Sequence, residues 1–581
     1  MRKILFSFLT VAFCYLAPHN LYAANLFVST TPPVGGSDCS TAAMACSLTQ
    51  ALSVAADGDE IKLAAGDYTV STGDQVIQVG KNLTIQGALD GISSINGQNS
   101  RRGFFIIAGK TAIISNVLIV NGKGGGAGIL NLGNLLLKDS FIQDNHAGNG
   151  AFDLGGGLSN LGIAILNNVV IQDNTAYSGA GVINVRVGRS EAKLSILNSS
   201  IVNNATSALG GKGAGLFNAN GELYLANVTV SGNQTTGSGA GLFQTLGTSV
   251  THFSTFYNNH ADTAGTHSSS GGGFYIEGGT LASLASVFAN NHIGLDRAAN
   301  DCVTAGAGDL FQTYNINLIG AVDSACRIQN MTPGVANLTG TVTEPLDAKL
   351  RELSVASLGL LFLQRNHTPI PGSPVIDKIP QTQCRLGLGE TAALLTIDQR
   401  ASARPYSPSV EKKCDLGAVE ATPALVPLES NTHRYADTQV GSTLAHNLVL
   451  TNVGDIAMKV SEASVDNTNF NVNISDCTAD ILPGSHCTVA VNFAPTQVGE
   501  QHGVLTVKTT APIFNQFTYT LDGKALAAAD HDVRDQQVPL PRGGAGVAGG
   551  GCSMSVGSVG GLTSLLPFVF VIASFAIRRR K

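Results

Sequence analysis

A recurring glycine motif divides part of the chain into segments of nearly constant length. Triplets that begin and end with glycine occur at residues 126–128, 155–157, 179–181, 213–215, 239–241 and 271–273. Two apolar runs and a closing asparagine follow each triplet. These asparagines are Asn145, Asn174, Asn204, Asn233, Asn259 and Asn291, separated by 29, 30, 29, 26 and 32 residues. Such a period is typical of solenoids, in which each repeat forms one coil.

Within a repeat, apolar residues alternate with polar or small ones, as in LYLANVTVS at residues 223–231. This period of two predicts strands rather than helices. Short strands that recur once per coil cannot bury a face alone, so stacked coils share one core, and the closing asparagines can form a ladder. The glycine triplets precede strands and are interpreted as turns. The sequence therefore predicts an all-β chain whose main domain is a right-handed parallel β-helix.

The composition agrees with such a fold and argues against several functions. Glycine contributes 68 of 581 residues, and charged residues make up 13%, about half the usual share. The formal net charge of −6 indicates no basic surface for nucleic acid. The chain has no tryptophan, which disfavours a groove that stacks carbohydrate rings.

The N-terminus has the layout of a secretory signal peptide. Arg2 and Lys3 precede an apolar stretch from Ile4 to Leu16, and small residues follow at Ala23 and Ala24. We expect cleavage near these alanines and export of the remaining chain.

Eight later cysteines fall into local couples: Cys39 with Cys46, Cys302 with Cys326, Cys384 with Cys414, and Cys477 with Cys487. In an exported chain such spacing suggests disulfides, although it does not fix their connectivity.

Two sets of motifs flank the repeats. Residues 46–52 read CSLTQAL and residues 56–61 read ADGDEI. This opening resembles CSLREA-type exported β-helix proteins, with Thr49 and Gln50 where Arg and Glu are usual. Further on come PGSPVID at 371–377, DQR at 398–400 and CDLGAVE at 414–420, which resemble the closing segment of the choice-of-anchor Q family, with Ala401 in place of a usual glycine. The resemblance implies a pectin-lyase-like β-helix and surface display, but it supplies no reaction.

The region after residue 420 has about seven short strands separated by turn signals. Its strings TNVG at 451–454, LPG at 482–484, FAPT at 493–496 and LDG at 521–523 resemble the choice-of-anchor D domain, an immunoglobulin-like β-sandwich.

The C-terminus combines a glycine-rich stretch ending at Gly551-Cys552, an apolar span from Val556 to Ile577 and a basic end. The span is long enough for one transmembrane helix, with the basic end on the cytoplasmic side. The three parts together resemble bacterial tripartite sorting signals of the rhombosortase type. We expect a sorting protease to process the chain at Gly551 or Cys552; a retained membrane anchor is the alternative.

These patterns give the following organisation: residues 1–24 signal peptide, 25–420 parallel β-helix with cap and closing segment, 421–525 sandwich, 526–551 linker, and 552–581 sorting signal.

Candidate catalytic and metal-binding residues are sparse. Asp144 and Asp173 occupy equivalent positions before a closing asparagine and are expected to stack, most simply as solvated turns. His260 and His292 follow closing asparagines of neighbouring coils, but three or four convergent ligands are normally needed for a metal, so no cofactor is expected. No nucleophile motif is visible, and no catalytic residue is assigned.

Two functions remain open. The first is a non-catalytic surface or adhesion protein, held at the cell envelope or released by processing, whose elongated face binds a protein or glycan. The second is a polysaccharide lyase or glycoside hydrolase with carboxylates assembled between coils.

Overall fold

The computed structural model describes residues 23–527, apart from residues 34–36, 189, 267–269, 307, 309, 358–362, 371, 388–391, 406–412, 422–424, 428–431, 453, 455–456, 483 and 511–515. Most of the expected signal peptide, the linker and the tail with Gly551 and Cys552 lie outside these described residues. Within the described part, no helix is long and apolar enough to cross a membrane.

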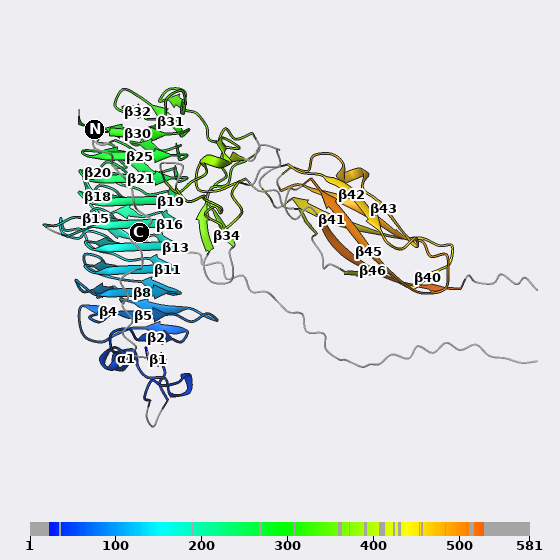
Figure 1. Cartoon of the computed structure of the whole chain (residues 1–581), viewed down its shortest axis with the longest axis horizontal. Helices are drawn as coiled ribbons and strands as arrows, with labels where there is room; N and C mark the ends of the chain where they lie inside the picture. Colours follow the sequence, from blue (N-terminus) through cyan, green and yellow to red (C-terminus); the bar gives the residue numbers. More distant parts are fainter. Residues whose placement is uncertain are drawn as a thin grey trace, which may run out of the picture. The chain divides into compact units, whose positions relative to one another are not determined.

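Residues 25–341 form a solenoid of stacked parallel strands (Figure 1). The pairing of the strands divides the solenoid into three faces. The first face contains β1 (Asn25–Val28), β2 (Glu60–Leu63), β5 (Leu83–Gln86), β8 (Thr111–Ser115), β21 (Thr248–His252), β25 (Thr280–Leu284), β30 (Leu310–Tyr314) and β32 (Ile328–Asn330). The second face contains β3 (Gly66–Tyr68), β6 (Ser93–Asn96), β9 (Val117–Val120), β22 (Thr255–Tyr257), β26 (Val287–Ala289), β31 (Leu318–Val322) and β33 (Leu338–Thr341).

Four longer strands bend across the corner and contribute to both of these faces: β11 (Asn134–Gln143), β13 (Ile163–Gln172), β16 (Lys193–Val202) and β19 (Glu222–Ser231). The third face is a separate sheet of β4 (Gln75–Val79), β7 (Arg102–Ile106), β10 (Ile129–Asn131), β12 (Leu158–Asn160), β15 (Val182–Val185), β18 (Leu216–Ala219), β20 (Leu242–Thr245), β24 (Phe274–Ile276) and β29 (Cys302–Thr304). Two short sheets line one corner. One pairs β14 (Thr175–Ala176) with β17 (Ala205–Thr206), and the other contains β23 (His260–Ala261), β27 (His292–Ile293) and β28 (Ala298–Ala299). The expected parallel β-helix is confirmed.

The closing asparagines form the expected ladder inside the solenoid. The Oδ1 atom of Asn174 accepts hydrogen bonds from the backbone N and the Nδ2 of Asn145, at 3.1 and 2.9 Å. The same two bonds repeat at each later step, and the ladder ends on the buried carboxylate of Asp301. Each coil is thereby held in one register with the next.

The glycine triplets form turns, as expected. The first glycine of each has a positive φ between 61° and 74°. At Gly213 a Cβ atom would lie 2.4 Å from the carbonyl oxygen of Leu216, so this turn needs glycine sterically as well as conformationally.

The N-terminal end of the solenoid is capped. The helix α1 (Leu48–Val54) buries Leu48 and Ala51, beside the short 3₁₀ helix η1 (Ala42–Met44). The Cys39–Cys46 disulfide joins the loop that hydrogen-bonds to β1. The other three expected disulfides, Cys302–Cys326, Cys384–Cys414 and Cys477–Cys487, are also present, which settles the connectivity.

We call residues 346–421 the closing segment. It contains β34 (Ser354–Ser357), β35 (Leu363–Asn366), β36 (Ile379–Pro380), η2 (Gln381–Gln383) and β37 (Lys413–Cys414). It hydrogen-bonds along the second face, from Asn168 and Ser200 to Thr255 and Ala285. The segment therefore covers a flank of the solenoid.

The remaining strands form the two sheets of an immunoglobulin-like domain. Most neighbouring strands in these sheets are antiparallel. One contains β38 (Leu425–Pro427), β41 (Leu444–Asn452), β44 (His486–Phe493) and β43 (Phe470–Asn473). The other contains β39 (Thr432–Arg434), β40 (Thr438–Gln439), β46 (Gln516–Leu526), β45 (Gly499–Thr509) and β42 (Val460–Val465), and η3 (Ser475–Cys477) lies between β43 and β44. Inward side chains such as Leu450, Val489, Leu505 and Tyr519 share one core.

Candidate functional site

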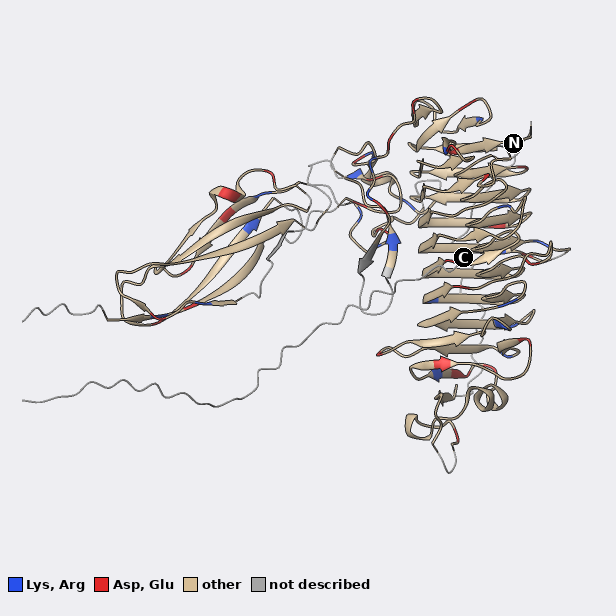
Figure 2. Cartoon of the chain, turned by 180° about the vertical axis from the view of Figure 1, so that it is seen from behind, with Lys and Arg blue, Asp and Glu red and all other residues tan. Residues whose placement is uncertain are grey.

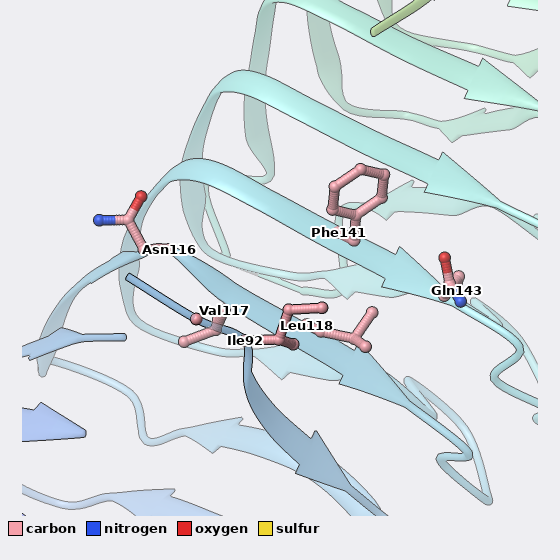
Figure 3. Close-up of a pocket in the computed structure, with 7 residues that line it drawn as sticks. Ile92, Asn116, Val117, Leu118, Phe141 and Gln143 are labelled. Atoms are coloured by element: carbon pink, nitrogen blue, oxygen red, sulfur yellow. The ribbon is translucent and has the colours of Figure 1, made fainter. Parts of the chain in front are cut away.

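A groove lies on the second face of the solenoid in its early coils. It has a volume of about 260 Å³ and is lined by Gly91, Ile92, Asn116, Val117, Leu118, Phe141 and Gln143. Figure 3 shows Asn116 at one end, Gln143 at the other, and the apolar side chains between them. None of the lining residues carries a titratable side chain.

The floor of the groove comes from outward positions of neighbouring strands. Leu118 on β9 and Phe141 on β11 are register partners, while the alternate residues Ile119 and Ile142 point into the core. The side chain of Ile92, just before β6, is 59% exposed. Outward positions of a solvated strand are usually polar, so this apolar patch is a departure that needs an explanation.

Carboxylates stand at both ends of the groove. Asp139 and Asp144 flank the second-face part of β11, and both have positive φ values because they form corners. Asn168 donates to Asp139 at 2.7 Å. Gln143, which lines the groove, donates to Asp144 at 3.2 Å.

The structure also brings Asp144 and Asp173 together on adjacent coils, as expected. Burial raises the pKa of Asp173, the Asp144 carboxylate raises it further, and the Arg365 guanidinium opposes both. The Nε of Arg365 donates to the Oε1 of Gln172 at 2.6 Å. The sequence did not predict Arg365 at this place, because this residue belongs to the closing segment and no repeat in the sequence relates it to the coil that it contacts.

Later coils of the second face are covered by amide side chains of the closing segment. Gln364 accepts a 2.7 Å bond from Ser200 and donates to Asn168 at 2.8 Å. Gln399 donates to Ser200 at 2.9 Å and accepts from Thr229 at 2.5 Å. These side chains form a hydrogen-bonded polar network across the interface.

The same interface contains a serine and histidine pair that the sequence did not reveal. The Oγ of Ser231 lies 2.7 Å from the Nε2 of His367, whose Nδ1 lies 2.7 Å from the carbonyl oxygen of Arg351. With Nδ1 protonated, Nε2 accepts the serine proton, the arrangement that a general base requires. Ser231 and His367 are only 1% and 3% exposed, so the pair joins two segments and no substrate reaches it in this structure.

The motifs of the closing segment form a buried ionic network. Asp398 accepts from the backbone N of Arg400 and of Glu420, at 2.7 and 3.0 Å. Arg404 lies 3.2 Å from the Glu420 carboxylate, with both side chains almost wholly buried. Burial raises the pKa of Asp415 well above its usual range, and Glu420 adds to the shift. These charged residues stabilise the fold of the segment, and none of them is among the lining residues of the groove above.

The two histidines considered as metal ligands are register partners on neighbouring parallel strands, His260 on β23 and His292 on β27. The Nε2 of His260 lies 2.7 Å from the Gly294 carbonyl oxygen, and the Nδ1 of His292 lies 3.0 Å from that of Arg297. The Arg297 guanidinium lies 3.4 Å from the Nδ1 of His260. Burial and Arg297 lower the pKa of His292 to about 4. A cation would compete with this guanidinium, and among the described residues no three His, Cys, Asp or Glu side chains converge.

Figure 2 shows that charged residues are sparse on the described strands of the solenoid and form no continuous basic stripe. The groove and the two aspartates beside it stand out against this sparsely charged surface.

Comparisons with known proteins address both domains. The ASH family model (abnormal spindle-like microcephaly-associated, ASPM-SPD-2-Hydin) matches residues 429–513, within the immunoglobulin-like domain. No curated protein matches the chain.

Several solved structures are similar to parts of the chain. Pectate lyase Pel9A is 12% identical with a TM-score of 0.38, over 68% of this chain and 96% of that one. The PapD-like domain 7 of human CEP192 is 15% identical with a TM-score of 0.17, over 21% and 97%. The secreted serine protease VesC of Vibrio cholerae is 19% identical with a TM-score of 0.15, over 18% of this chain and only 24% of the protease.

Proposed function

We propose that this chain is an exported, non-catalytic surface protein that binds an extracellular ligand on the flank of its β-helix. The observation that carries the proposal is the chemistry of the groove. Its floor is apolar and its seven lining residues offer no acid, base or nucleophile. These lining residues can hold a ligand, but they supply no group for proton transfer or covalent catalysis.

The proposal includes the fate of the two ends of the chain. The N-terminal pattern directs export, and the tail holds the chain at the envelope until processing at Gly551 or Cys552 replaces or releases the anchor. The choice-of-anchor and rhombosortase-type resemblances support this route. Intact mass spectrometry of the protein recovered from cells tests it: retention of the sequence through Lys581 contradicts processing.

Adhesion of the full-length protein tests the binding function. The purified protein is applied to immobilised extracellular matrix proteins, mucins and glycans, and its release of product from uronic-acid and neutral polysaccharides is measured in parallel. Saturable binding without turnover is the expected result. Turnover of any of these polysaccharides contradicts the proposal.

One observation favours the second candidate, a polysaccharide lyase. Asp144 and Asp173 are stacked beside Arg365, and a lyase of this shape needs carboxylates for Ca²⁺ together with a basic group. Calcium-dependent formation of unsaturated products from polygalacturonate, lost in Asp173→Asn and in Arg365→Ala, is the result that would establish it. Unchanged activity in both variants would place any turnover elsewhere.

A further inference from the structure

The groove is bounded by acids on opposite sides. Asp139 and Asp144 flank the same four-residue stretch of the chain, Ser140 to Gln143, which contains Phe141 and Gln143 of the groove lining. Because a strand advances about 3.4 Å per residue, the two Cα atoms are separated by roughly 17 Å. An elongated ligand that crosses the second face meets a carboxylate, then apolar surface, then a second carboxylate.

The charge around the groove is unbalanced. On the second-face stretches of β3, β6, β9, β11 and β13, each taken with the corner residue at either end, the charged residues are Asp67, Asp139, Asp144 and Asp173. Lys138 precedes Asp139 on the first-face part of β11, and Arg365 reaches this face from the closing segment. Burial is the main cause of the raised pKa of Asp173, and repulsion by the Asp144 carboxylate on the adjacent coil raises this pKa further. Cationic groups of a ligand relieve this repulsion, whereas an anionic polymer such as a polyuronate increases it.

The apolar floor of the groove also narrows the class of ligand that can bind there. Its apolar surface is mainly aliphatic, from Ile92, Val117 and Leu118, and Phe141 adds one aromatic ring. Sugar recognition usually relies on broad aromatic platforms, and the chain has no tryptophan. An apolar side chain of a peptide fits an aliphatic floor better, because both surfaces then leave water.

We propose that this groove binds an extended basic peptide of a partner protein, with an apolar side chain on Leu118 and Ile92 and Lys or Arg side chains at Asp139 and Asp144. The proposal rests on the ligand-binding function above and names the class of its ligand. In an extended peptide, residues i, i+2 and i+4 share one side. A peptide with basic residues at i and i+4 and leucine at i+2 therefore matches the order of acid, apolar floor and acid.

The test uses the full-length protein and a labelled peptide of sequence Lys-Ser-Leu-Ser-Lys, repeated twice, followed by fluorescence anisotropy. Two control peptides replace either both lysines by glutamate or the leucine by serine. Ile92→Ser is expected to weaken binding about tenfold because it removes apolar contact. Asp144→Asn is expected to weaken it severalfold at low salt and less at physiological salt.

Matched control variants lie elsewhere on the solenoid. Leu246→Ser changes a side chain that is 57% exposed, close to the 59% of Ile92. Asp296→Asn removes an exposed acid from a turn at another corner. Both are expected to bind the peptide like the parent protein. Normal thermal unfolding of all four variants shows that any loss of binding is local.

The possible outcomes separate this proposal from the broader one. Equal binding of the glutamate peptide, or no effect of Ile92→Ser, overturns the peptide site, and so does cellohexaose binding that Ile92→Ser abolishes while the lysine peptide fails to bind. If the protein still adheres to immobilised ligands in those cases, the surface-binding function stands with a different site or ligand. If it adheres to nothing, the broader function fails as well.

Discussion

The second face of the solenoid has two halves that share a backbone and differ in their outward side chains. In the half with the groove, outward positions on β9 and β11 carry Leu118 and Phe141. In the half under the closing segment, equivalent positions on β16 and β19 carry Ser200 and Thr229, which bond to glutamine side chains. We call these the groove half and the covered half.

The difference shows how one repeating scaffold serves two purposes. In a permanent contact within one chain, buried polar groups that hydrogen-bond to one another fix how the two segments are aligned. Any shift of one segment along the other would leave buried donors and acceptors without partners. A ligand site gains from apolar surface that gives affinity without demanding one fixed pattern of hydrogen bonds. The two halves therefore predict opposite responses to substitution.

The largest expected effect is in the ionic network that supports the covered half. Glu420→Ala leaves the buried Arg404 without its carboxylate and is expected to lower the free energy of unfolding by about 3–5 kcal/mol. Chemical denaturation measures it. The exposed pair Glu462 and Lys508 is the control, and Glu462→Ala should change little. An equal effect of the two substitutions would show that the closing segment does not depend on its buried charges.

The next largest effect is expected from acid, at the place where the closing segment meets the first face. His252 lies buried on the first face against the Arg385 backbone, and burial lowers its pKa to about 4. The folded protein then resists a proton that the unfolded chain accepts below about pH 6.5, so stability is lost as the pH falls from 6.5 towards 4, by roughly 3 kcal/mol.

The matched variant isolates this effect. His252→Phe keeps the ring and removes the titration, so the difference in unfolding free energy between parent and variant should shift in favour of the variant as the pH falls. Measuring the difference matters because burial also raises the pKa of Asp301 to about 7, which acts in the opposite sense. A difference that stays constant between pH 7 and pH 4 contradicts the assignment.

A single amide of the covered half should have a smaller effect. Gln399→Ala removes the partner of Thr229 and of Ser200 and is expected to cost about 1–3 kcal/mol. Hydrogen exchange should show the loss locally, with faster exchange in β16 and β19 and unchanged exchange in β5 and β8. Uniformly faster exchange across all coils would mean that the halves unfold as one unit.

The fold was predictable wherever a signal repeats. The spacing of the asparagines from Asn145 to Asn291 predicted the coil and its ladder, and the cysteine couples predicted the disulfides, because both depend on local distance along the chain. Two contacts of the closing segment could not be predicted in this way, because they join residues 136 and 193 positions apart and no repeat in the sequence indicates them. They are Ser231 with His367 and Gln172 with Arg365. The groove had a weak signal: VLIV at residues 117–120 is apolar at outward as well as inward positions.

The smallest expected effect on stability is in the groove half, where it is also the most informative. Ile92→Ser changes a largely exposed side chain outside the core, so the free energy of unfolding should change by no more than about 0.5 kcal/mol. The same substitution is the one expected to weaken ligand binding most. A scan that finds Ile92→Ser as destabilising as Gln399→Ala would show that the apolar floor is part of the fold, and the contrast between the two halves would then have no functional meaning.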